Sequence, residues 1–299
     1  MIVSYVAGQA SPGLIQLQHL QQQIAARLFA YCAAEGLTIF LVCGSALGAV
    51  RHGGTVPWDD DIDLGMMRPD FDRLQARLAV APLPGLFLQS HATEAGYPFP
   101  FVKLRLDGTH VEEPDQLGPN AHHGVFVDIF PFDEIPRSRL LRRAQRAALG
   151  VVNLFIMPLS PHALAVTSSK SIQVARRVGL RLRRVLPRRA FIALREWLSR
   201  LSGVPKGPIV DSFGMYGIRH GPETPVRADC LVPPVPVSFG TISAWLPNDA
   251  DTYLRGLFGD YRKLPPEAQR LPGHVFSAEF GDHAKDVLAI VAADGQVSK

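Results

Sequence analysis

The chain has few cysteines and no long apolar run. Its three cysteines (Cys32, Cys43 and Cys230) lie far apart and form no C-x₂-C pair, which argues against a disulfide framework and a zinc knuckle. No segment approaches the roughly 18 uninterrupted apolar residues that are needed to cross a bilayer. The first residues, MIVSYVAGQASPG, lack the basic and apolar regions of a signal peptide. We therefore expect a soluble, cytoplasmic protein of a reducing compartment.

Two common catalytic signatures are also absent. No G-x-x-x-x-G-K-[ST] segment occurs, so the chain has no P-loop. No G-x-S-x-G elbow surrounds Ser45, which argues against this serine as a covalent nucleophile.

Acidic residues are nearly missing from one long segment. Between Arg137 and Lys206 there are sixteen Lys or Arg residues but a single acidic residue, Glu196, although the net charge of the whole chain is only +4. Arg176 to Arg184 (RRVGLRLRR) alternates basic and apolar residues at helical spacing. Such a helix can be a solvated face, bind an anionic membrane surface or bind nucleic acid. The lack of interleaved aromatic residues disfavours nucleic acid.

The most informative positive feature is the segment Trp58 to Arg73 (WDDDIDLGMMRPDFDR). On a strand, Asp61 and Asp63 would project to one face, while Ile62 and Leu64 would enter the core. Neighbouring carboxylates repel each other unless a cation lies between them, and Mg²⁺ prefers such oxygen ligands. The pattern predicts a phosphoryl-transfer site, with a solvated acidic turn as the alternative. Asp59 and Asp60 are expected in the preceding loop.

The residues upstream favour the phosphoryl-transfer interpretation. Leu37 to Cys43 is an apolar run of strand length that leads into Gly44 and Ser45. Small residues at this point allow close approach of a phosphate, and a helix that begins there directs its N–H groups at the anion. Arg51, on the same predicted helix, is a candidate phosphate ligand because its planar guanidinium can bind two oxygens at once.

A third carboxylate and two cations lie further along the chain. Asp128 stands alone in the apolar strand Val125–Phe130 and would need a cation or strong donor if buried. Its rival, Asp133, follows Pro131, where we expect the strand to stop, and is interpreted as a helix cap. Lys103 and Arg105 would face the same side of another strand and could neutralise phosphate charge.

The order of predicted elements indicates an α/β (α+β) fold, with a mixed sheet flanked by helices. We expect a helix over 14–35, strands at 37–43, 62–66, 85–89, 101–106 and 125–130, and helices at 45–51 and 70–78. The segment 140–201 is expected to be helical. We divide the chain into a catalytic core (1–136), a basic helical insertion (137–206) and a C-terminal segment that returns to the core (207–299).

These motifs carry a family resemblance. The Gly-Ser turn followed by Asp-x-Asp resembles the nucleotidyltransferase-fold signature, and Gly44 to Met66 (GSALGAVRHGGTVPWDDDIDLGM) resembles the LicD family at full motif length. The segments FVKLRLDGT (Phe101 to Thr109) and GVFVDIFPFD (Gly124 to Asp133) resemble later elements of that family. So does the closing block that runs from Tyr253 through Arg270 to His274.

The resemblance implies a nucleotidyltransferase-like core that uses Mg²⁺, with Mn²⁺ as the alternative, held by Asp61, Asp63 and Asp128. It implies a cytidine diphosphate (CDP)-linked alcohol as donor, such as choline, ethanolamine or ribitol. The acceptor would be a sugar hydroxyl of a cell-surface glycan or glycolipid at the inner face of the membrane, where the basic insertion fits peripheral attachment.

Further roles follow from the same resemblance. Gly44, Ser45 and Arg51 would bind phosphate, Lys103 and Arg105 would offset charge on the transferring group, and Asp128 would orient or deprotonate the acceptor. Two other functions stay open: a nucleotidyltransferase that uses nucleoside triphosphates, and a non-catalytic nucleic-acid-binding module. The intact Asp-x-Asp disfavours the last of these.

Overall fold

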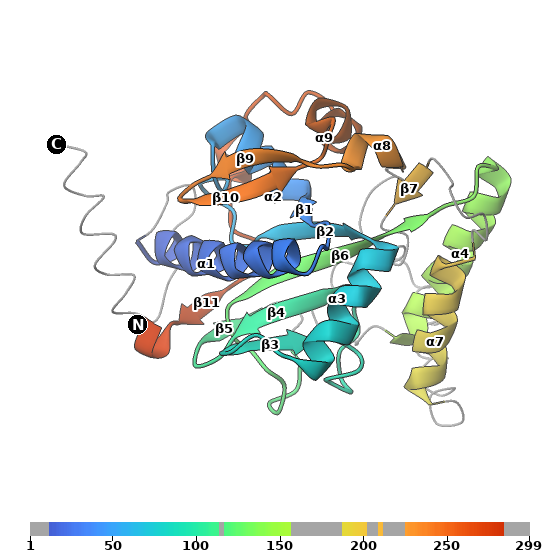
Figure 1. Cartoon of the computed structure of the whole chain (residues 1–299), viewed down its shortest axis with the longest axis horizontal. Helices are drawn as coiled ribbons and strands as arrows, with labels where there is room; N and C mark the ends of the chain where they lie inside the picture. The colour runs from blue at the N-terminus through green and yellow to red at the C-terminus, as the bar shows by residue number, and fades with distance from the viewer. Residues whose placement is uncertain (1–11, 114–116, 157–186, 202–208, 212–224, 284–299) are drawn as a thin grey trace.

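The computed structural model describes residues 12–113, 117–156, 187–201, 209–211 and 225–283, arranged around one mixed sheet (Figure 1). The seven-stranded sheet has the order β1-β2-β6-β4-β3, and β7 and β8 extend it from the end of β6. Its strands are β1 (Phe40–Leu41), β2 (Asp63–Met67), β3 (Leu86–Gln89), β4 (Val102–Leu106), β6 (Phe126–Glu134), β7 (Ile209–Asp211) and β8 (Val226–Arg227). Two antiparallel pairs stand beside it: β5 (His110–Glu112) with β11 (Ser277–Glu279), and β9 (Val235–Phe239) with β10 (Ile242–Leu246).

The two central strands, β2 and β6, run parallel, whereas β1 and β4 flank them in antiparallel orientation. In the β2–β6 pair Asp63 is the register partner of Asp128. Along β6, Val127 and Ile129 belong to the main hydrophobic core, while Asp128 and Phe130 line a cavity. The strand therefore presents one face to the core and the other to the cavity, as its alternation requires. The predicted mixed sheet flanked by helices is confirmed.

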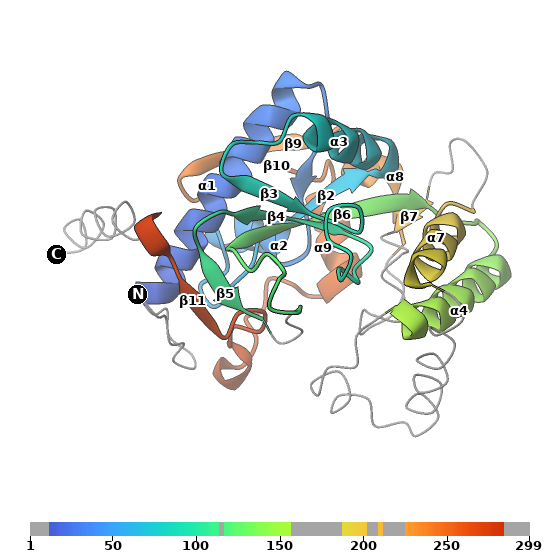
Figure 2. The same ribbon diagram turned by 90° about the horizontal axis from the view of Figure 1, so that it is seen from below.

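Helices pack against this sheet and its edges (Figures 1 and 2). They are α1 (Pro12–Ala34), α2 (Cys43–His52), α3 (Arg68–Val80), α4 (Arg139–Ile156), α7 (Arg188–Ser199), α8 (Ala228–Leu231) and α9 (Ala250–Phe258), with short 3₁₀ turns at η2 (Glu267–Gln269) and η3 (Gly281–His283). In α1, Leu17, Ile24 and Leu28 are buried at helical spacing. Gly36 follows with a φ of 61°, in the left-handed conformation that commonly ends helices.

Two sequence predictions about strands were wrong. The strand expected over 37–43 pairs only at Phe40 and Leu41, because β1 has a single short neighbour, β2. Strand β6 does not stop at Pro131 but continues to Glu134. Proline lacks an N–H, yet on the side away from β2 no strand of the described residues pairs with Pro131: β4 pairs only up to Ile129, and β7 begins at Asp133.

The described parts of the predicted helical segment 140–201 form the helix pair α4–α7. Gln145 Nε2 donates to Leu198 O at 2.5 Å and Arg188 Nη2 to Ile156 O at 3.1 Å, so the two helices run antiparallel. They share a small core of their own, made of Ile135, Leu149, Val152, Ile156 and Leu198. The basic segment Arg176 to Arg184 lies outside the described residues, and the division into 1–136, 137–206 and 207–299 stays a prediction. Across the described ranges, no helix combines the length and apolarity needed to cross a bilayer.

Candidate active site

Three carboxylates meet where β2 and β6 begin. Asp63 opens β2, Asp128 is its register partner on β6, and Asp61 lies two residues before β2. One oxygen from each of the three lies within 4.8 Å of the others. All three line a cavity of about 830 Å³. The Asp-x-Asp alternation and the parallel register together account for this convergence.

Burial and the mutual repulsion of the carboxylates raise the pKa of two of them, Asp63 and Asp128. Burial raises the pKa of Asp63 well above its usual range, and the negative charges of Asp61 and Asp128 raise it further. Burial also raises the pKa of Asp128 to about 6, although the neighbouring Lys103 opposes this shift. A divalent cation would offset the mutual repulsion, and three carboxylate oxygens at this spacing are a suitable donor set for a hard cation such as Mg²⁺. The residues present therefore fit a metal.

A buried network supports Asp128 from the side of β4. Lys103 Nζ lies 2.9 Å from Asp128 Oδ1 and 3.2 Å from Glu113 Oε1. Arg105 Nη2 donates to the same Glu113 at 2.6 Å. The two cations hold the pKa of Glu113 below its usual value even though burial acts in the opposite direction. Glu113 thus joins the two basic residues, and Lys103 is shared between it and Asp128.

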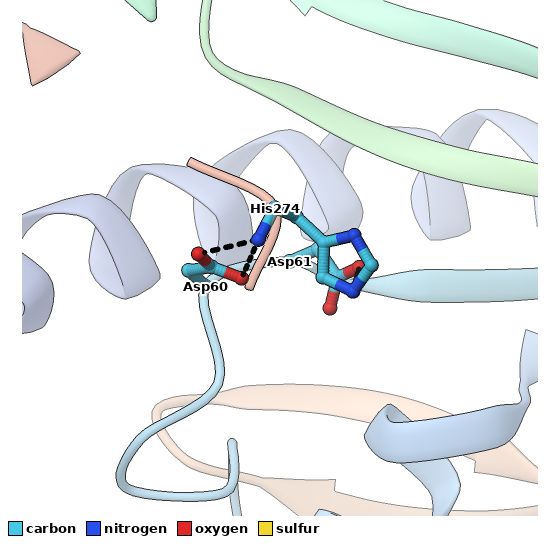
Figure 3. Close-up of side chains that lie close together, drawn as sticks. All are labelled: Asp60, Asp61 and His274. Carbon is cyan, nitrogen blue, oxygen red and sulfur yellow. Dashed lines mark hydrogen bonds and ion pairs between the residues drawn. The ribbon is translucent and has the colours of Figure 1, made fainter. Parts of the chain in front are cut away.

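The acidic loop before β2 is held by hydrogen bonds to the backbone carbonyl and to the side chain of Asp60. Gln21 Nε2 of α1 donates to Asp60 O at 2.8 Å. The side chain of Asp60 is fully buried and accepts the N–H groups of His274, at 2.9 Å, and Val275, at 2.8 Å (Figure 3). Asp60 therefore ties the loop to the C-terminal segment. Asp59, by contrast, lines the cavity, and burial together with Asp61 raises its pKa well above the usual range.

The same C-terminal segment places a histidine beside the carboxylates. His274 Nε2 lies 3.4 Å from Asp61 Oδ2, with the imidazole ring beside that carboxylate (Figure 3), and His274 is one of the residues that line the cavity. The negative charge of Asp61 raises the pKa of His274. Asp60, Asp61 and His274 form a second group whose ligand atoms lie within 4.8 Å of one another. Since Asp60 already accepts two backbone N–H groups, we regard the aspartate trio as the better metal site.

The turn from β1 into α2 brings the Gly-Ser segment to this site. Cys43 has a φ of 48°, a left-handed conformation that is uncommon for a residue with a side chain. Gly44 then lines the cavity, and a Cβ built on it would lie 2.5 Å from Asp59 Oδ2, so any side chain here would displace the Asp59 carboxylate. Ser45 is buried, and its Oγ accepts the N–H of Asp63 at 2.8 Å. Its hydroxyl thereby fixes the start of β2.

Comparison with known proteins decides the family. A sequence model described as "LicD/FKTN/FKRP, nucleotidyltransferase domain" matches residues 36–160. The lipopolysaccharide cholinephosphotransferase LicD of Haemophilus influenzae is 43% identical over 261 residues, which cover 83% of this chain and 91% of that protein. The chain belongs to the LicD family.

A second relative aligns with a smaller part of this chain. The ribitol 5-phosphate transferase FKRP of Mus musculus is 30% identical over 132 residues, which cover 43% of this chain and 24% of that protein. Both relatives are transferases by name. As a LicD family member this chain is an enzyme, a LicD-type phosphotransferase, as the sequence resemblance implied.

Most of the site residues expected for a LicD enzyme lie around the one cavity. Asp61, Asp63 and Asp128 converge there, and Gly44, Arg51, Lys103 and Arg105 line it. Ser45 contacts Asp63 from behind and is not among the lining residues. Each nitrogen of the Arg105 guanidinium donates to a protein acceptor: Gln89, Gly124 or Glu113. These contacts orient Glu113, so any phosphate contact of Arg105 stays a prediction.

Several residues of the cavity were missed by sequence reasoning. Glu113 carries no local pattern, and His274 appears only within the closing block of the LicD resemblance. An aromatic wall was also missed, formed by Tyr97, Phe99, Phe101 and Phe130. Tyr97, Phe99 and Phe101 come from the loop before β4 and Phe130 from β6, and Phe101 lies 4.6 Å from Phe130 between ring centres. The packing of this loop against β6 is a long-range contact, which local sequence patterns do not indicate.

Asp133, weighed as a rival to Asp128, proves to have a different role. It is not a helix cap but a residue of β6, where its two oxygens accept from Arg68 Nε at 2.6 Å and Nη2 at 2.7 Å. The helix-cap prediction failed because Arg68 is the partner, from the start of α3, and no local signal links the two residues.

Proposed function

We propose that this LicD enzyme transfers a phospho-alcohol from a CDP-linked donor to a sugar hydroxyl of a cell-surface glycan or glycolipid, with Mg²⁺ as cofactor. The observation that supports this most directly is the convergence of Asp61, Asp63 and Asp128 in a cavity large enough for a nucleotide-linked substrate. The names of the relatives, a cholinephosphotransferase that acts on lipopolysaccharide and a ribitol 5-phosphate transferase, supply the substrate class. The alcohol is choline, ethanolamine or ribitol.

Asp61, Asp63 and Asp128 would hold the metal. A bound Mg²⁺, or Mn²⁺ in its place, would supply positive charge that stabilises the leaving nucleoside monophosphate. The chain's own residues set up the rest. Ser45 Oγ accepts the backbone N–H of Asp63, and Lys103 Nζ contacts the carboxylate of Asp128. Both carboxylates are therefore oriented before the substrate binds.

Asp128 also has a second role in this proposal. Burial raises the pKa of Asp128 above that of an ordinary aspartate, and an oxygen that the metal leaves free could receive the proton of the acceptor hydroxyl. That hydroxyl would attack the phosphorus of the alcohol phosphate in line, the bond to the nucleotide phosphate would break, and cytidine monophosphate (CMP) would leave. The aromatic wall would exclude water from the reacting group.

The test is product detection by mass spectrometry with purified protein, Mg²⁺, extracted glycolipid, and CDP-choline, CDP-ethanolamine or CDP-ribitol. The Asp61→Asn and Asp63→Asn variants remove charge without changing shape, and Asp229→Asn, an exposed residue outside the cavity, is the matched control. Mg²⁺-dependent CMP release that is lost in the first two variants and retained in the control supports the proposal.

The opposite result points to different chemistry. No CMP from any of the three donors, with folded protein and acceptor present, contradicts the proposed donor class. Incorporation of a labelled nucleoside monophosphate from a nucleoside triphosphate would instead support the nucleotidyltransferase alternative.

The helix pair α4–α7 supports a further part of the proposal, peripheral attachment to an anionic membrane. Each helix buries one face and exposes apolar side chains on another; Leu140 is 76% exposed and Trp197 is 59% exposed. Arg139, Arg143 and Arg189 are exposed on the same two helices. Apolar side chains beside arginines, with a tryptophan among them, match the interface of a bilayer that carries negative headgroups.

Vesicle flotation tests this attachment. We expect the protein to float at low salt with vesicles that contain phosphatidylglycerol and to stay behind with phosphatidylcholine alone. The double change Leu140→Ser with Trp197→Ser should abolish flotation, whereas Val80→Ser, at an 87% exposed apolar position on α3, should not. Equal behaviour of the two variants, or no flotation of the wild type, contradicts the attachment.

A further inference from the structure

Two arginine side chains, Arg51 from the cavity lining and Arg270 from outside it, lie against the ring of Trp58. The guanidinium carbon of Arg51 lies 5.8 Å from the centre of the Trp58 ring, and that of Arg270 lies 5.3 Å from it. Arg51 and Trp58 line the cavity. Arg51 comes from the end of α2 and Arg270 from the residue after η2, so the fold brings two like charges together from distant parts of the chain.

Neither cation is paired with a carboxylate in the described part of the chain. Arg51 donates from Nε to His52 Nε2 at 2.9 Å and from Nη1 to Tyr261 O at 3.1 Å. Arg270 donates from Nε to Pro265 O at 2.9 Å. These bonds orient the two guanidinium groups but do not neutralise them. Arg68 and Arg105 differ in this respect, since each is bonded to a buried carboxylate.

The unmatched charge has a cost that an anion would relieve. Burial lowers the pKa of Arg51, and the nearby charge of Arg270 lowers it further. Among the described residues, Arg51 Nη2 and the two terminal nitrogens of Arg270 have no hydrogen-bond acceptor. These N–H groups belong to planar forks, which suit the oxygens of a phosphate.

The pair lies close to the aspartate trio along two neighbouring segments. Trp58 is three residues before Asp61 in one segment, and Arg270 is four residues before His274 in the other. The two segments meet where His274 Nε2 approaches Asp61 at 3.4 Å. Since a chain advances at most about 3.6 Å per residue, the Cα atoms of Trp58 and Asp61 lie within about 11 Å of each other. One substrate with two charged groups can reach both places.

We propose that Arg51, Arg270 and Trp58 form an anion subsite that binds a phosphate-bearing part of a substrate while the aspartates hold the reacting group. The substrate's identity rests on the proposed function, but the existence of the anion subsite does not. The phosphate belongs either to the donor diphosphate or to a phosphorylated acceptor. Arg270 would be the specificity-determining residue, since both of its terminal nitrogens lack an acceptor among the described residues, whereas Arg51 Nη1 already donates to Tyr261 O.

Binding of inorganic pyrophosphate in the presence of EDTA tests the subsite without turnover and without metal. Isothermal titration would compare wild type with Arg270→Gln, Arg270→Lys and Arg51→Gln. The matched control is Arg262→Gln, an exposed arginine nearby that pairs with Asp251. We expect at least about tenfold weaker binding for Arg270→Gln and Arg51→Gln, a partial loss for Arg270→Lys because charge stays while the fork is lost, and no change for the control.

Turnover with CDP-choline and extracted glycolipid then separates the two sources. A raised KM for the donor in Arg270→Gln assigns the phosphate to the donor, and a raised KM for the acceptor alone assigns it to the acceptor. If pyrophosphate binding depends on Arg270 but no donor is turned over, the anion subsite stands and the proposed function fails.

Two results would overturn the subsite. One is pyrophosphate binding that is undetectable in the wild type or equal in wild type, Arg270→Gln and Arg51→Gln. The other is weakened pyrophosphate binding with both KM values unchanged, which would mean an adventitious ion only. Thermal unfolding of each variant distinguishes loss of the subsite from loss of the fold.

Discussion

The β2–β6 strand pair carries buried charge at both of its ends, and the two ends are balanced in different ways. At the start, Asp63 faces Asp128 and Asp61 joins them, with Lys103 as the cation in contact. At the other end, five residues further along β6, Asp133 accepts two hydrogen bonds from Arg68. The first end keeps surplus negative charge, whereas the second is neutralised by the chain itself.

The two ends of the strand pair differ in the cations that their aspartates meet. Both aspartates of β6 are buried, so burial alone does not distinguish them. What differs is the partner: Arg68 meets Asp133 with a fork that matches both oxygens, while Lys103 is shared between Asp128 and Glu113. A group of carboxylates that lacks enough cations of its own is the end that an external cation and a phosphate substrate would complete.

The largest effect should come from removing one charge at the acidic end. For Asp63→Asn we expect CMP release to fall on the order of 10³-fold, since a group that stabilises the transition state is lost. The free energy of unfolding in EDTA should stay equal or rise, because repulsion with Asp61 and Asp128 is relieved. Urea unfolding and a CMP assay on the same preparations measure both. A clear loss of stability together with retained activity would contradict the comparison.

The neutral end should respond in the opposite way. Asp133→Ala leaves Arg68 buried without its main partner, and we expect the free energy of unfolding to fall by about 3 kcal/mol. Glu196, at 3.5 Å from Arg68, limits the loss. Activity per folded molecule should be unchanged. Urea unfolding beside Asp229→Asn as control measures the stability, and an unaltered midpoint would show that the Arg68–Asp133 pair is dispensable.

Local patterns predicted the acidic end well but not the neutral end. Strand alternation suffices to place Asp61 and Asp63 on one side, and the lone charge in Val125–Phe130 marks Asp128. Asp133 was misjudged because Pro131 suggested a strand end, whereas the strand continues past this proline, beside which no other described strand pairs on the side away from β2. Its partner, Arg68, is 65 residues away in sequence. Sequence spacing carries no information about such a pair.

Two residues that complete the cavity, Glu113 and His274, could not be predicted from local sequence patterns for the same reason. Glu113 lies just after β5 and meets two residues of β4, Lys103 at 3.2 Å and Arg105 at 2.6 Å. His274 reaches Asp61 from the far end of the chain, through bonds between its backbone and Asp60. Both depend on long-range contacts, which neither charge patterning nor periodicity describes.

Removing the charge of Glu113, which contacts Lys103 and Arg105, should have an effect of intermediate size on the free energy of unfolding. Glu113→Gln removes the carboxylate that Lys103 and Arg105 share, and each cation keeps other acceptors. We therefore expect a loss of about 2 kcal/mol in the free energy of unfolding. Chemical denaturation measures this loss. A neutral result would mean that the two cations are balanced without Glu113.

We expect the smallest effect on activity from a substitution at Gly44, in the Gly-Ser turn. Gly44→Ala places a Cβ 2.5 Å from Asp59 Oδ2, so Asp59 must move, and we expect CMP release to fall about tenfold, as for other residues that orient a metal site. Gly150→Ala is the matched control, because a Cβ there meets nothing within 4 Å. In the interior of α4 this control should gain roughly 0.5–1 kcal/mol of stability. Equal activity of the two variants would show that Asp59 can move without consequence.

We infer that the acidic end of the strand pair needs an external cation. The most direct measurement is the free energy of unfolding with EDTA and with Mg²⁺, compared for wild type, Asp63→Asn and Asp229→Asn. At Mg²⁺ about 100 times its Kd, wild type and Asp229→Asn should gain about 2.7 kcal/mol, and Asp63→Asn should gain nothing. An equal gain in Asp63→Asn, or no gain in the wild type, would contradict the account.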